Sequence, residues 1–245
     1  MPRIVIGSRG SQLALTQSKA VGESLRNAVP GLEVEIEIIH TQGDKILDAP
    51  LSQIGGKGLF TRELEVALLE KRIDLAVHSL KDLPTELPEG LALGCVPERE
   101  DPHDVFVSAE YDTLDALPKG ATVGTSSLRR RAQLLAYRPD LNVVDLRGNI
   151  DTRLRKVAEK RFDGAILARA GIVRIGRADA IRCCISEAVM IPATAQGALG
   201  IEIREGDRRV TDIVSRIHDA RAFVEVAAER ACLAALEGGC QVPIG

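Results

Sequence analysis

Two well-separated segments of this chain share one pattern. The segment IVIGSRGSQLALTQ near the start is matched by TVGTSSLRRRAQLLA from Thr122, and each predicts a short buried strand, a turn of Gly, Ser and Thr, and a helix. Residues 70–77 and 159–166 repeat a second unit, in which a helix ends and the next strand begins. Because alternating strands and helices form parallel sheets, the chain predicts an α/β fold with two similar lobes.

Two segments are expected to cross between these lobes. The first is the charged stretch Cys95–Asp101, which Pro102 follows, and the second lies near Pro192–Gly200. After the second crossing, the apolar run Leu199–Ile203 is expected to return to the first lobe, which makes that lobe discontinuous. Two crossings leave a cleft between the lobes, where folds of this kind usually bind their ligands.

Composition excludes several classes of protein. The 245 residues can bury a large core, and 45% of them are hydrophobic, but only 2% are aromatic. Few aromatic side chains are available to stack on bases, and the net charge is -3, so we expect no nucleic-acid partner. No stretch approaches the roughly 20 apolar residues of a membrane span, and the start lacks the apolar core of a signal peptide. We therefore expect a cytoplasmic protein without a membrane partner.

A long connection is expected between the predicted strand at 33–38 and the predicted helix at 59–71. His40–Gly58 is polar and Gly-rich, and it is too long to be a simple connection, so we expect a functional loop. Its Gly55-Gly56-Lys57-Gly58 run lacks a preceding strand, and the chain has no GxxxxGK[ST] motif. A phosphate-handling nucleotide enzyme is therefore disfavoured.

Three polar turns follow predicted strands and open predicted helices. They are Gly7–Ser11, Gly124–Arg131 and Leu146–Asn149, the last with Arg153 one turn further on. Free backbone N–H groups and the helix dipole favour anions at such places, and Arg adds paired donors for carboxylate or phosphate. For any one turn, ordinary N-capping by Ser and Thr with solvent-facing Arg is the alternative. Recurrence in both halves favours a ligand with several negative groups.

The segment HSLKDLP from His78 lies at the carboxyl end of a predicted strand, where open α/β sheets place their reactive groups. Asp82 beside Lys81 is compatible with an ordinary surface ion pair. Against a cleft lined with Arg, Asp82 is instead the carboxylate expected to bind a cationic or N–H-bearing centre and to exchange protons.

The five cysteines are an odd number without CxxC spacing, which argues against a disulfide framework and against structural zinc. Cys95 and the pair Cys183-Cys184 are expected to pack in strands. Cys240 follows Gly238 and Gly239. A buried, inert thiol is the common alternative, but a thiol on an accessible loop in a cationic neighbourhood is a good nucleophile for a covalent attachment.

Eight segments, considered together, resemble the porphobilinogen deaminase family over essentially the whole chain. They are IGSRGSQLAL, HTQGDK, GGKGLFTRELE, DLAVHSLKDLP, VGTSSLRRRAQL, LRGNIDTRLRK, PATAQGALGIE and EGGCQVPIG. The resemblance implies a dipyrromethane cofactor bonded through a thioether to Cys240, and a catalytic acid at Asp82. It also implies a set of residues that bind cofactor and substrate, namely Arg9, Ser11, Lys57, Ser79, Lys81, Thr125, Ser126, Ser127, Arg129, Arg130, Arg147, Arg153, Arg174, Gln196 and Gly197.

The same resemblance implies a reaction. Four porphobilinogen molecules are joined head to tail on the cofactor with loss of ammonia, and water then releases hydroxymethylbilane. Asp82 would stabilise the cationic azafulvene and carry protons, while the Arg side chains offset the two carboxylates that each pyrrole brings. No metal ion is implied, and we expect a monomer.

The family fold implies two doubly wound lobes like those of type II periplasmic binding proteins, followed by a small α+β domain that carries the cofactor loop. We expect the first lobe at 1–97 and 198–217, the second at 102–193, and the start of the third domain at 218–245. The family continues after GGCQVPIG, so we expect this domain to be truncated at Gly245. The alternative is a non-catalytic solute-binding or sensor module, which would leave Asp82 and Cys240 unexplained.

Overall fold

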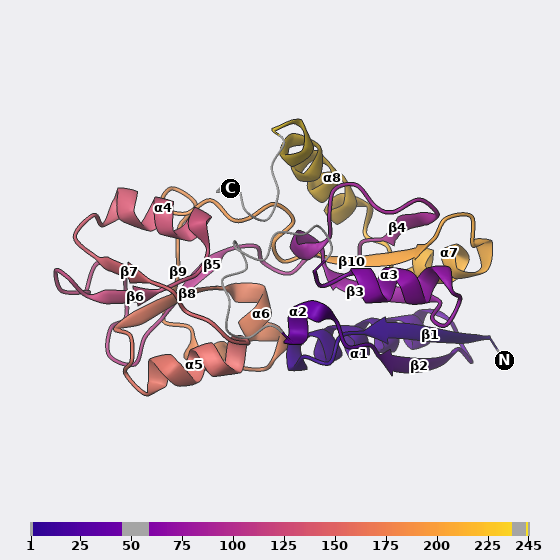
Figure 1. Ribbon diagram of the computed structural model, residues 1–245, viewed down its shortest axis with the longest axis horizontal. Helices are drawn as coiled ribbons and strands as arrows, with labels where there is room; N and C mark the ends of the chain where they lie inside the picture. Colours follow the sequence, from indigo (N-terminus) through magenta and orange to yellow (C-terminus); the bar gives the residue numbers. More distant parts are fainter. Residues whose placement is uncertain (1, 46–58, 237–243, 245) are drawn as a thin grey trace. The chain divides into compact units, whose positions relative to one another are not determined.

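The computed structural model describes residues 2–45, 59–236 and 244. These residues form two compact units, one containing residues up to Arg99 together with Ala198–Leu236, and the other containing Glu100–Gly197. Each unit is built on a five-stranded mixed sheet with helices on both faces (Figure 1). The predicted α/β class with two similar lobes is confirmed.

The first unit has the strand order β2-β1-β3-β10-β4. Its strands are β1 (Arg3–Ser8), β2 (Glu33–Ile38), β3 (Leu75–Ser79), β4 (Leu91–Cys95) and β10 (Leu199–Arg204). Its helices are α1 (Gln12–Ala28), α2 (Gln42–Lys45), α3 (Arg62–Leu69), α7 (Arg208–Val214) and α8 (Ala220–Ala235), with 3-10 turns η2 (Leu80–Asp82) and η4 (Ser215–Ile217). β1, β2 and β3 are parallel, whereas β10 runs antiparallel to β3 and β4. α1 and α7 cover one face of the sheet, and α3 covers the other.

The second unit has the order β7-β6-β8-β5-β9. Its strands are β5 (Asp104–Val107), β6 (Thr122–Gly124), β7 (Asn142–Val144), β8 (Gly164–Ala168) and β9 (Cys183–Cys184). Its helices are α4 (Leu128–Tyr137), α5 (Ile150–Ala158) and α6 (Arg169–Arg174), with the 3-10 turn η3 (Ala178–Ala180). α4 covers one face, while α5 and α6 cover the other. As in the first unit, the first three strands in the order of the sheet are parallel, and the fourth, here β5, runs antiparallel to its neighbour β8.

The junction between a helix and the following strand is the same in both units, as the sequence repeat predicts. Lys71 and Lys160 both adopt the left-handed region, with φ of 59° and 56°. Asp74 follows in one unit and Asp163 in the other, and each side chain accepts a hydrogen bond from the backbone of the neighbouring parallel strand, at 2.8 Å and 2.6 Å. The repeat in the letters is therefore a repeat in backbone conformation and in side-chain bonding.

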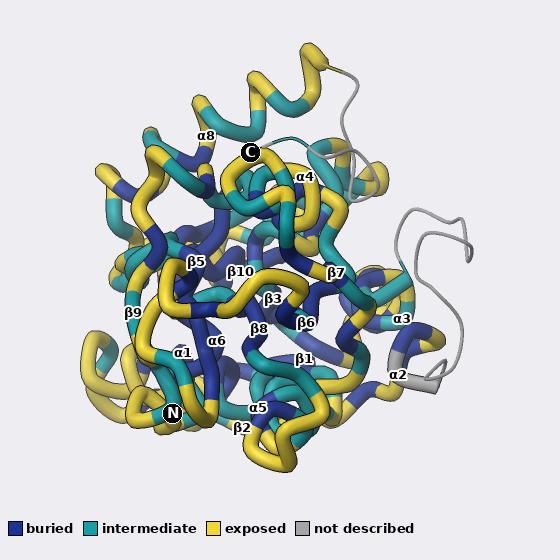
Figure 2. The backbone as a smooth tube through the Cα atoms, turned by 90° about the vertical axis from the view of Figure 1, so that its left-hand side faces the viewer, coloured by how far each residue is buried: buried dark blue, intermediate teal, exposed yellow. Residues whose placement is uncertain are grey.

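Close packing at the second strand in the order of each sheet, β1 and β6, needs glycine. A Cβ on Gly7 would lie 2.3 Å from Ile73 Cδ1, and one on Gly124 would lie 2.9 Å from Leu146 Cβ. The central strands β3, β8 and β10 are buried almost throughout and are dark blue in Figure 2. Because both faces of these strands are covered, they consist largely of aliphatic residues rather than alternating with polar ones.

One predicted element is wrong in part. Within His40–Gly58, expected to be a loop, Gln42–Lys45 forms the short helix α2. Its first N–H groups donate to Glu63 Oε1 and to the Leu59 carbonyl, both at 3.0 Å. These acceptors come from the start of the next helical region, so hydropathy spacing within the loop does not reveal them. Residues 46–58 lie outside the described residues.

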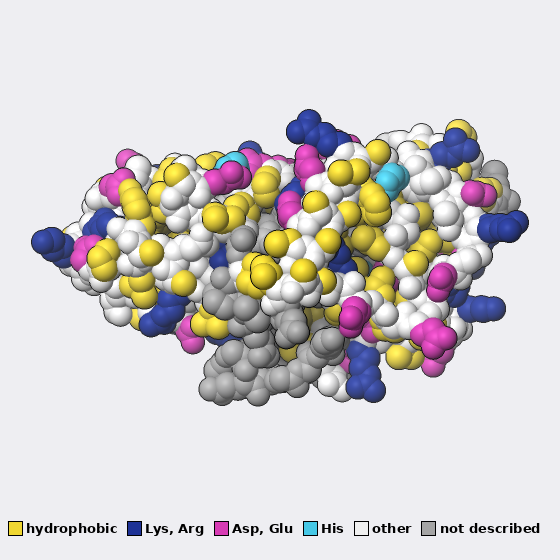
Figure 3. Space-filling model, turned by 90° about the horizontal axis from the view of Figure 1, so that it is seen from above, with side chains coloured by type: hydrophobic (Ala, Val, Ile, Leu, Met, Phe, Trp, Pro, Cys, Tyr) yellow, Lys and Arg dark blue, Asp and Glu magenta, His cyan; other side chains and the backbone are white. Residues whose placement is uncertain are grey.

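The long helix α8 groups with the first unit. Its buried positions are Ala222 and Val226, whereas Phe223 and Val224 are exposed. Exposed hydrophobic side chains, drawn in yellow, occur across the face of the molecule shown in Figure 3. No helix in the described ranges is long and apolar enough to cross a membrane. The third domain, the exact lobe boundaries and the cleft between the lobes stay predictions.

Candidate active site

The turn after β1 places Arg9 and Ser11 at the carboxyl end of the first sheet. Ser11 caps α1, because its Oγ accepts a hydrogen bond from the Ala14 N–H at 3.3 Å. The Arg9 guanidinium lies over the Phe60 ring, 4.2 Å from its centroid. N-capping therefore does describe Ser11, while Arg9 stacks on an aromatic side chain that the sequence analysis did not single out.

The chain turns sharply after β3 and places Asp82 at the same end of the sheet. Ser79 closes the strand, and its Oγ accepts a hydrogen bond from Gln17 Nε2 of α1 at 3.0 Å. Leu80 is fully buried and anchors η2, which also contains Lys81. The Asp82 side chain is exposed at the end of this turn. The strand end, the helix α1 and the acid are thus held together by packing and one hydrogen bond.

Arg9, Ser11, Ser79 and Asp82 all line one small pocket of about 60 Å³ within the first unit. The remaining lining residues are Leu13, Ala14, Gln17, Phe60, Thr61, Val77 and His78. A guanidinium and hydroxyl groups can hold an anionic group, while the carboxylate can accept from an N–H or stabilise a cation. Two segments that were predicted separately, the turn after β1 and the segment from His78, therefore contribute their site residues to one pocket.

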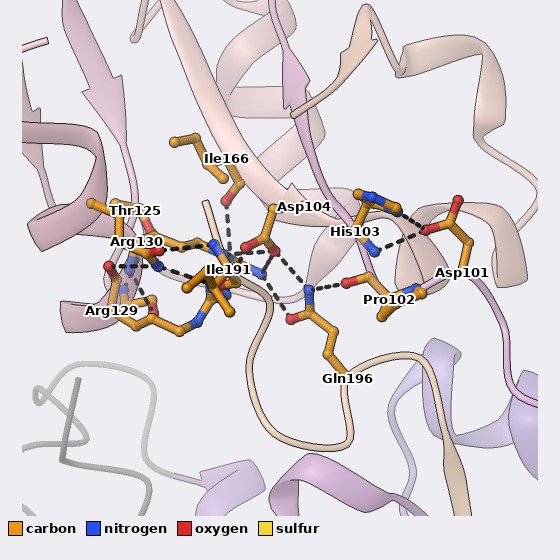
Figure 4. A network of polar contacts seen from close by, with 12 residues as sticks. Asp101, Pro102, His103, Asp104, Thr125, Arg129, Arg130, Ile166, Ile191 and Gln196 are labelled. Atoms are coloured by element: carbon orange, nitrogen blue, oxygen red, sulfur yellow. Dashed lines mark hydrogen bonds and ion pairs between the residues drawn. The ribbon is translucent and has the colours of Figure 1, made fainter. Parts of the chain in front are cut away.

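In the second unit, Arg129 and Arg130 turn inward onto Asp104, as the dashed lines in Figure 4 show. Arg129 Nη2 lies 2.7 Å from Asp104 Oδ2, and Arg130 Nη2 lies 2.7 Å from Oδ1. Gln196 Nε2 donates to the same Oδ1 at 2.8 Å and to the Pro102 carbonyl at 2.6 Å. Asp104 is completely buried, and the two Arg side chains nearly so. The alternative of solvent-facing Arg is therefore wrong for Arg129 and Arg130, whereas Arg131 of the same turn is exposed.

The network carries more positive than negative charge. Burial acts to raise the pKa of Asp104, but the charges of Arg130 and Arg129 outweigh it, and the pKa lies below its ordinary value. Burial lowers the pKa of Arg129, and the charge of Arg130 adds to this effect. Two guanidinium groups share one carboxylate, so the network holds one excess positive charge in a largely dry place.

The turn before α4 is made of three hydroxyl residues with separate structural bonds. Ser127 caps the helix by accepting from the Arg130 N–H at 3.4 Å, and Thr125 Oγ1 accepts from the Ser127 N–H at 3.2 Å. Ser126 Oγ donates to the Leu146 carbonyl at 3.1 Å. These bonds account for the local conformation of the turn, and ligand binding by Thr125, Ser126 and Ser127 stays a prediction.

The segment before α5 and the first turn of that helix hold two further predicted residues, Arg147 and Arg153. Asn149 caps the helix by accepting from the Thr152 N–H at 2.9 Å. Arg153 Nε donates to the Gly148 carbonyl at 2.8 Å, which folds its side chain back over the turn. Arg147 is half-buried beside them. Arg147 thus lies in the segment after β7, and Arg153 lies in the first turn of α5.

Gly197 lies at the end of the second unit, where two chain segments come very close. Its φ is +89°, and an added Cβ would lie 2.2 Å from the Glu100 carbonyl oxygen. Arg174 Nη2 donates to the Gly197 carbonyl at 2.6 Å, and burial lowers the pKa of Arg174. In the structure, these two predicted binding residues bond to each other; their role toward a ligand stays a prediction.

Two predicted residues, Lys57 and Cys240, lie outside the described residues. Conversely, Phe60, Gln17 and Asp104 were not among the site residues predicted from the sequence. Asp104 carried a usable signal, because it begins the strand DVFV, in which every other residue is apolar, so a buried acid there needs a partner. Among residues 2–45, 59–236 and 244, no cluster of three metal-ligating side chains occurs.

The fold is similar to that of solved binding proteins. The methionine-binding protein MetQ matches with a TM-score of 0.54 and 13% identity, covering 94% of this chain and 95% of that one. A periplasmic substrate-binding protein of an ABC transporter from Coxiella burnetii matches with a TM-score of 0.54 and 14% identity, covering 95% and 98%. The predicted likeness to type II periplasmic binding proteins is thus confirmed as a likeness of fold.

Sequence comparison is more specific. The family model described as porphobilinogen deaminase, dipyromethane cofactor binding domain, matches residues 4–212, and the C-terminal domain model of the same family matches 223–245. The porphobilinogen deaminase of Nitratidesulfovibrio vulgaris strain Miyazaki F is 53% identical over 244 residues, which are 100% of this chain and 77% of that protein. The one from Pelotomaculum thermopropionicum is 54% identical over 242 residues, which are 99% and 78%. This chain is an enzyme of the porphobilinogen deaminase family.

Proposed function

We propose that this chain is a transferase with hydroxymethylbilane synthase activity. It joins four porphobilinogen molecules head to tail, releases one ammonia for each, and hydrolyses the finished tetrapyrrole from its cofactor. Family membership supports this activity. The structural observation that carries it is the pocket in which the Asp82 carboxylate and the Arg9 guanidinium lie together.

Asp82 supplies the acid–base chemistry in this proposal. Its exposed carboxylate accepts from the pyrrole N–H and stabilises the positive charge that develops as the aminomethyl group departs as ammonia. The same carboxylate takes the proton that the attacked ring carbon loses. Arg9 and Ser11 bind a carboxylate of the substrate, and the hydrogen bond between Gln17 and Ser79 keeps the strand end and α1 in fixed relation.

The residues present fit a polyanionic cofactor. The Arg129, Arg130 and Asp104 network has one excess positive charge, which a carboxylate on a pyrrole ring would balance. Arg147, just before α5, and Arg153, in the first turn of α5, add two further cations in the same unit. We propose that these four Arg residues hold the acetate and propionate groups of a dipyrromethane bonded to Cys240. When bound, this group supplies the free carbon from which the chain grows.

A non-catalytic binding module is the second candidate, because the similar solved structures include binding proteins. It would use the Arg-rich turns for a reversible anion and would leave Asp82 without a role. Only the enzyme is expected to carry a covalent adduct of pyrrole units, so a measurement of that adduct distinguishes the two candidates.

We expect intact-mass analysis of the purified protein to show an adduct of two pyrrole units. Cys240→Ser should abolish both the adduct and the formation of product, whereas Cys232→Ser, which changes an exposed cysteine on α8, should keep both. A protein without adduct that still converts porphobilinogen would contradict the covalent attachment. Reversible binding without any conversion would favour the binding module.

A further inference from the structure

Three ionisable side chains are buried together between α3 and the first sheet. His78 lies on β3, Glu202 lies on the neighbouring strand β10, and Glu65 lies on α3. Their exposed fractions are 5%, 0% and 8%. Charged groups are seldom buried unless they are paired, so this cluster is unusual for a core between a helix and a sheet.

The contacts define which nitrogen of His78 is engaged. His78 Nε2 lies 3.0 Å from Glu202 Oε2, and within the described residues this is the hydrogen bond that the ring makes. A carboxylate accepts, so Nε2 carries the hydrogen and Nδ1 of the neutral ring keeps its lone pair. The carboxylate therefore fixes the tautomer that can accept a proton at Nδ1.

Two buried carboxyl groups lie beside the ring. Burial raises the pKa of Glu65, and the charge of Glu202 adds to this effect. Glu202 Oε1 is buried and has no hydrogen-bond partner among the described residues. The ring of His78 therefore contacts one oxygen of this buried carboxylate, while the other oxygen has no partner there.

His78 is also a lining residue of the Asp82 pocket. It is followed directly by Ser79, which closes β3, and then by the turn that holds Asp82. The charged groups near the ring are Glu202 from β10 and Glu65 from α3, and two more line the same pocket, Asp82 from η2 and Arg9 from the turn after β1.

We propose that His78 is a second proton-carrying group of this pocket, oriented by Glu202, and that it relieves Asp82 of the proton taken from the attacked ring carbon. This inference rests on the proposed function. The proton passes from the ring carbon to Asp82 and then to Nδ1 of His78, directly or through water. It leaves with the released ammonia as ammonium, so protons balance in each cycle and no electron is gained or lost.

Two variants and one control test the proposal in the cofactor-loaded enzyme. His78→Gln keeps an N–H that can donate to Glu202 but cannot carry a proton, and we expect at least about a ten-fold lower rate of product formation with the mass adduct retained. Glu202→Gln removes the charge with little change in volume, so the acid limb of the rate profile should move to lower pH. His218→Asn, which changes a histidine outside the pocket lining, should keep the wild-type rate and profile.

A purely structural role for His78 predicts a different result, because it would lower the rate by one factor at every pH. That outcome, or a wild-type rate and profile in His78→Gln, would overturn the proposal. NMR of labelled histidine decides the matter if either variant fails to fold, since the wild-type ring should carry hydrogen on Nε2 and gain one at Nδ1 on acidification. Hydrogen on Nδ1 alone would contradict it. A correct tautomer in an enzyme that does not convert porphobilinogen would instead refute the proposed function.

Discussion

The helices α1 and α4 begin with the same type of cap but differ in the residues that follow it. Ser11 and Ser127 both cap their helices through the N–H three residues later. The second and third positions after the cap are Leu13 and Ala14 in the first unit, but they are two arginines in the second. The small apolar pair leaves the first turn open as a pocket lining, whereas the arginines fill the second with buried charge. One backbone motif therefore serves two purposes.

The buried acids differ in the same way. Glu202 on β10 and Asp104 on β5 lie on strands that take the same place in the two sheets. Glu202 is opposite Ala76, inside the strand β3, whereas Asp104 is opposite Ala168, at the end of β8. The first acid contacts an imidazole, a group that exists in neutral and charged forms, and the second contacts guanidinium groups, which stay charged. We infer that protons move in the first unit and that charge is held in the second.

The largest expected effect is on catalysis in the first unit. Asp82→Asn keeps the size of the side chain but removes its charge and its ability to take a proton. We expect the rate of product formation to fall about 100- to 10 000-fold, with the free energy of unfolding little changed. Steady-state assays with Glu89→Gln, an exposed acid on the segment after η2, provide the control, which should keep the wild-type rate. A rate near wild type for Asp82→Asn would contradict the inference that proton transfer takes place in the first unit.

The second effect is on stability in the second unit. Asp104→Asn leaves two buried guanidinium groups without a counter-ion, and we expect a loss of about 3–5 kcal/mol in the free energy of unfolding. Asp101→Asn, three residues earlier in a half-buried pair with His103, should cost about 1 kcal/mol or less. Urea unfolding measures both. Equal losses for the two variants would show that the network does not stabilise the unit.

The smallest effect is a pH dependence in the first unit. The raised pKa of Glu65 means that the folded state binds this proton more tightly than the unfolded chain does. The resulting stabilisation is complete below the ordinary Glu pKa and is lost as the pH rises through the raised one. Glu65→Gln should flatten this part of the stability profile and change stability near neutral pH by about 1 kcal/mol or less. Unfolding curves from about pH 4 to about pH 8 test this, and parallel profiles for the two proteins would contradict it.

Much of the fold could be predicted because the repeat consists of features that depend on residues close together in the sequence. Hydropathy spacing, the Ser caps and the acid that ends each helix–strand junction are properties of neighbouring residues. The helix α2 could not be predicted in this way, since its first N–H groups are satisfied by Leu59 and Glu63, beyond the end of the loop. The pattern of residues within the loop contains no information about hydrogen-bond acceptors that lie outside it.

The first-unit site was also largely predictable, because Arg9, Ser11, Ser79 and Asp82 all lie at strand ends or just after them, at one edge of one sheet. The buried pairs were not. Asp104 follows a run of charged residues and so looks like a surface acid, although the wholly apolar VFV after it marks the start of a buried strand. Glu202 is a single acid in an otherwise apolar strand, and its partner His78 is distant in the sequence. A lone acid in such a strand is the signal to follow.

The central claim is that Asp82 performs the proton chemistry while the cationic residues only hold the anions. Intact-mass spectra recorded after brief mixing of cofactor-loaded protein with porphobilinogen test this directly. We expect the wild type to gain mass in steps of one porphobilinogen less one ammonia, and Asp82→Asn to keep the two-pyrrole adduct without gaining any step. A full ladder of steps on Asp82→Asn at the wild-type rate would contradict the account.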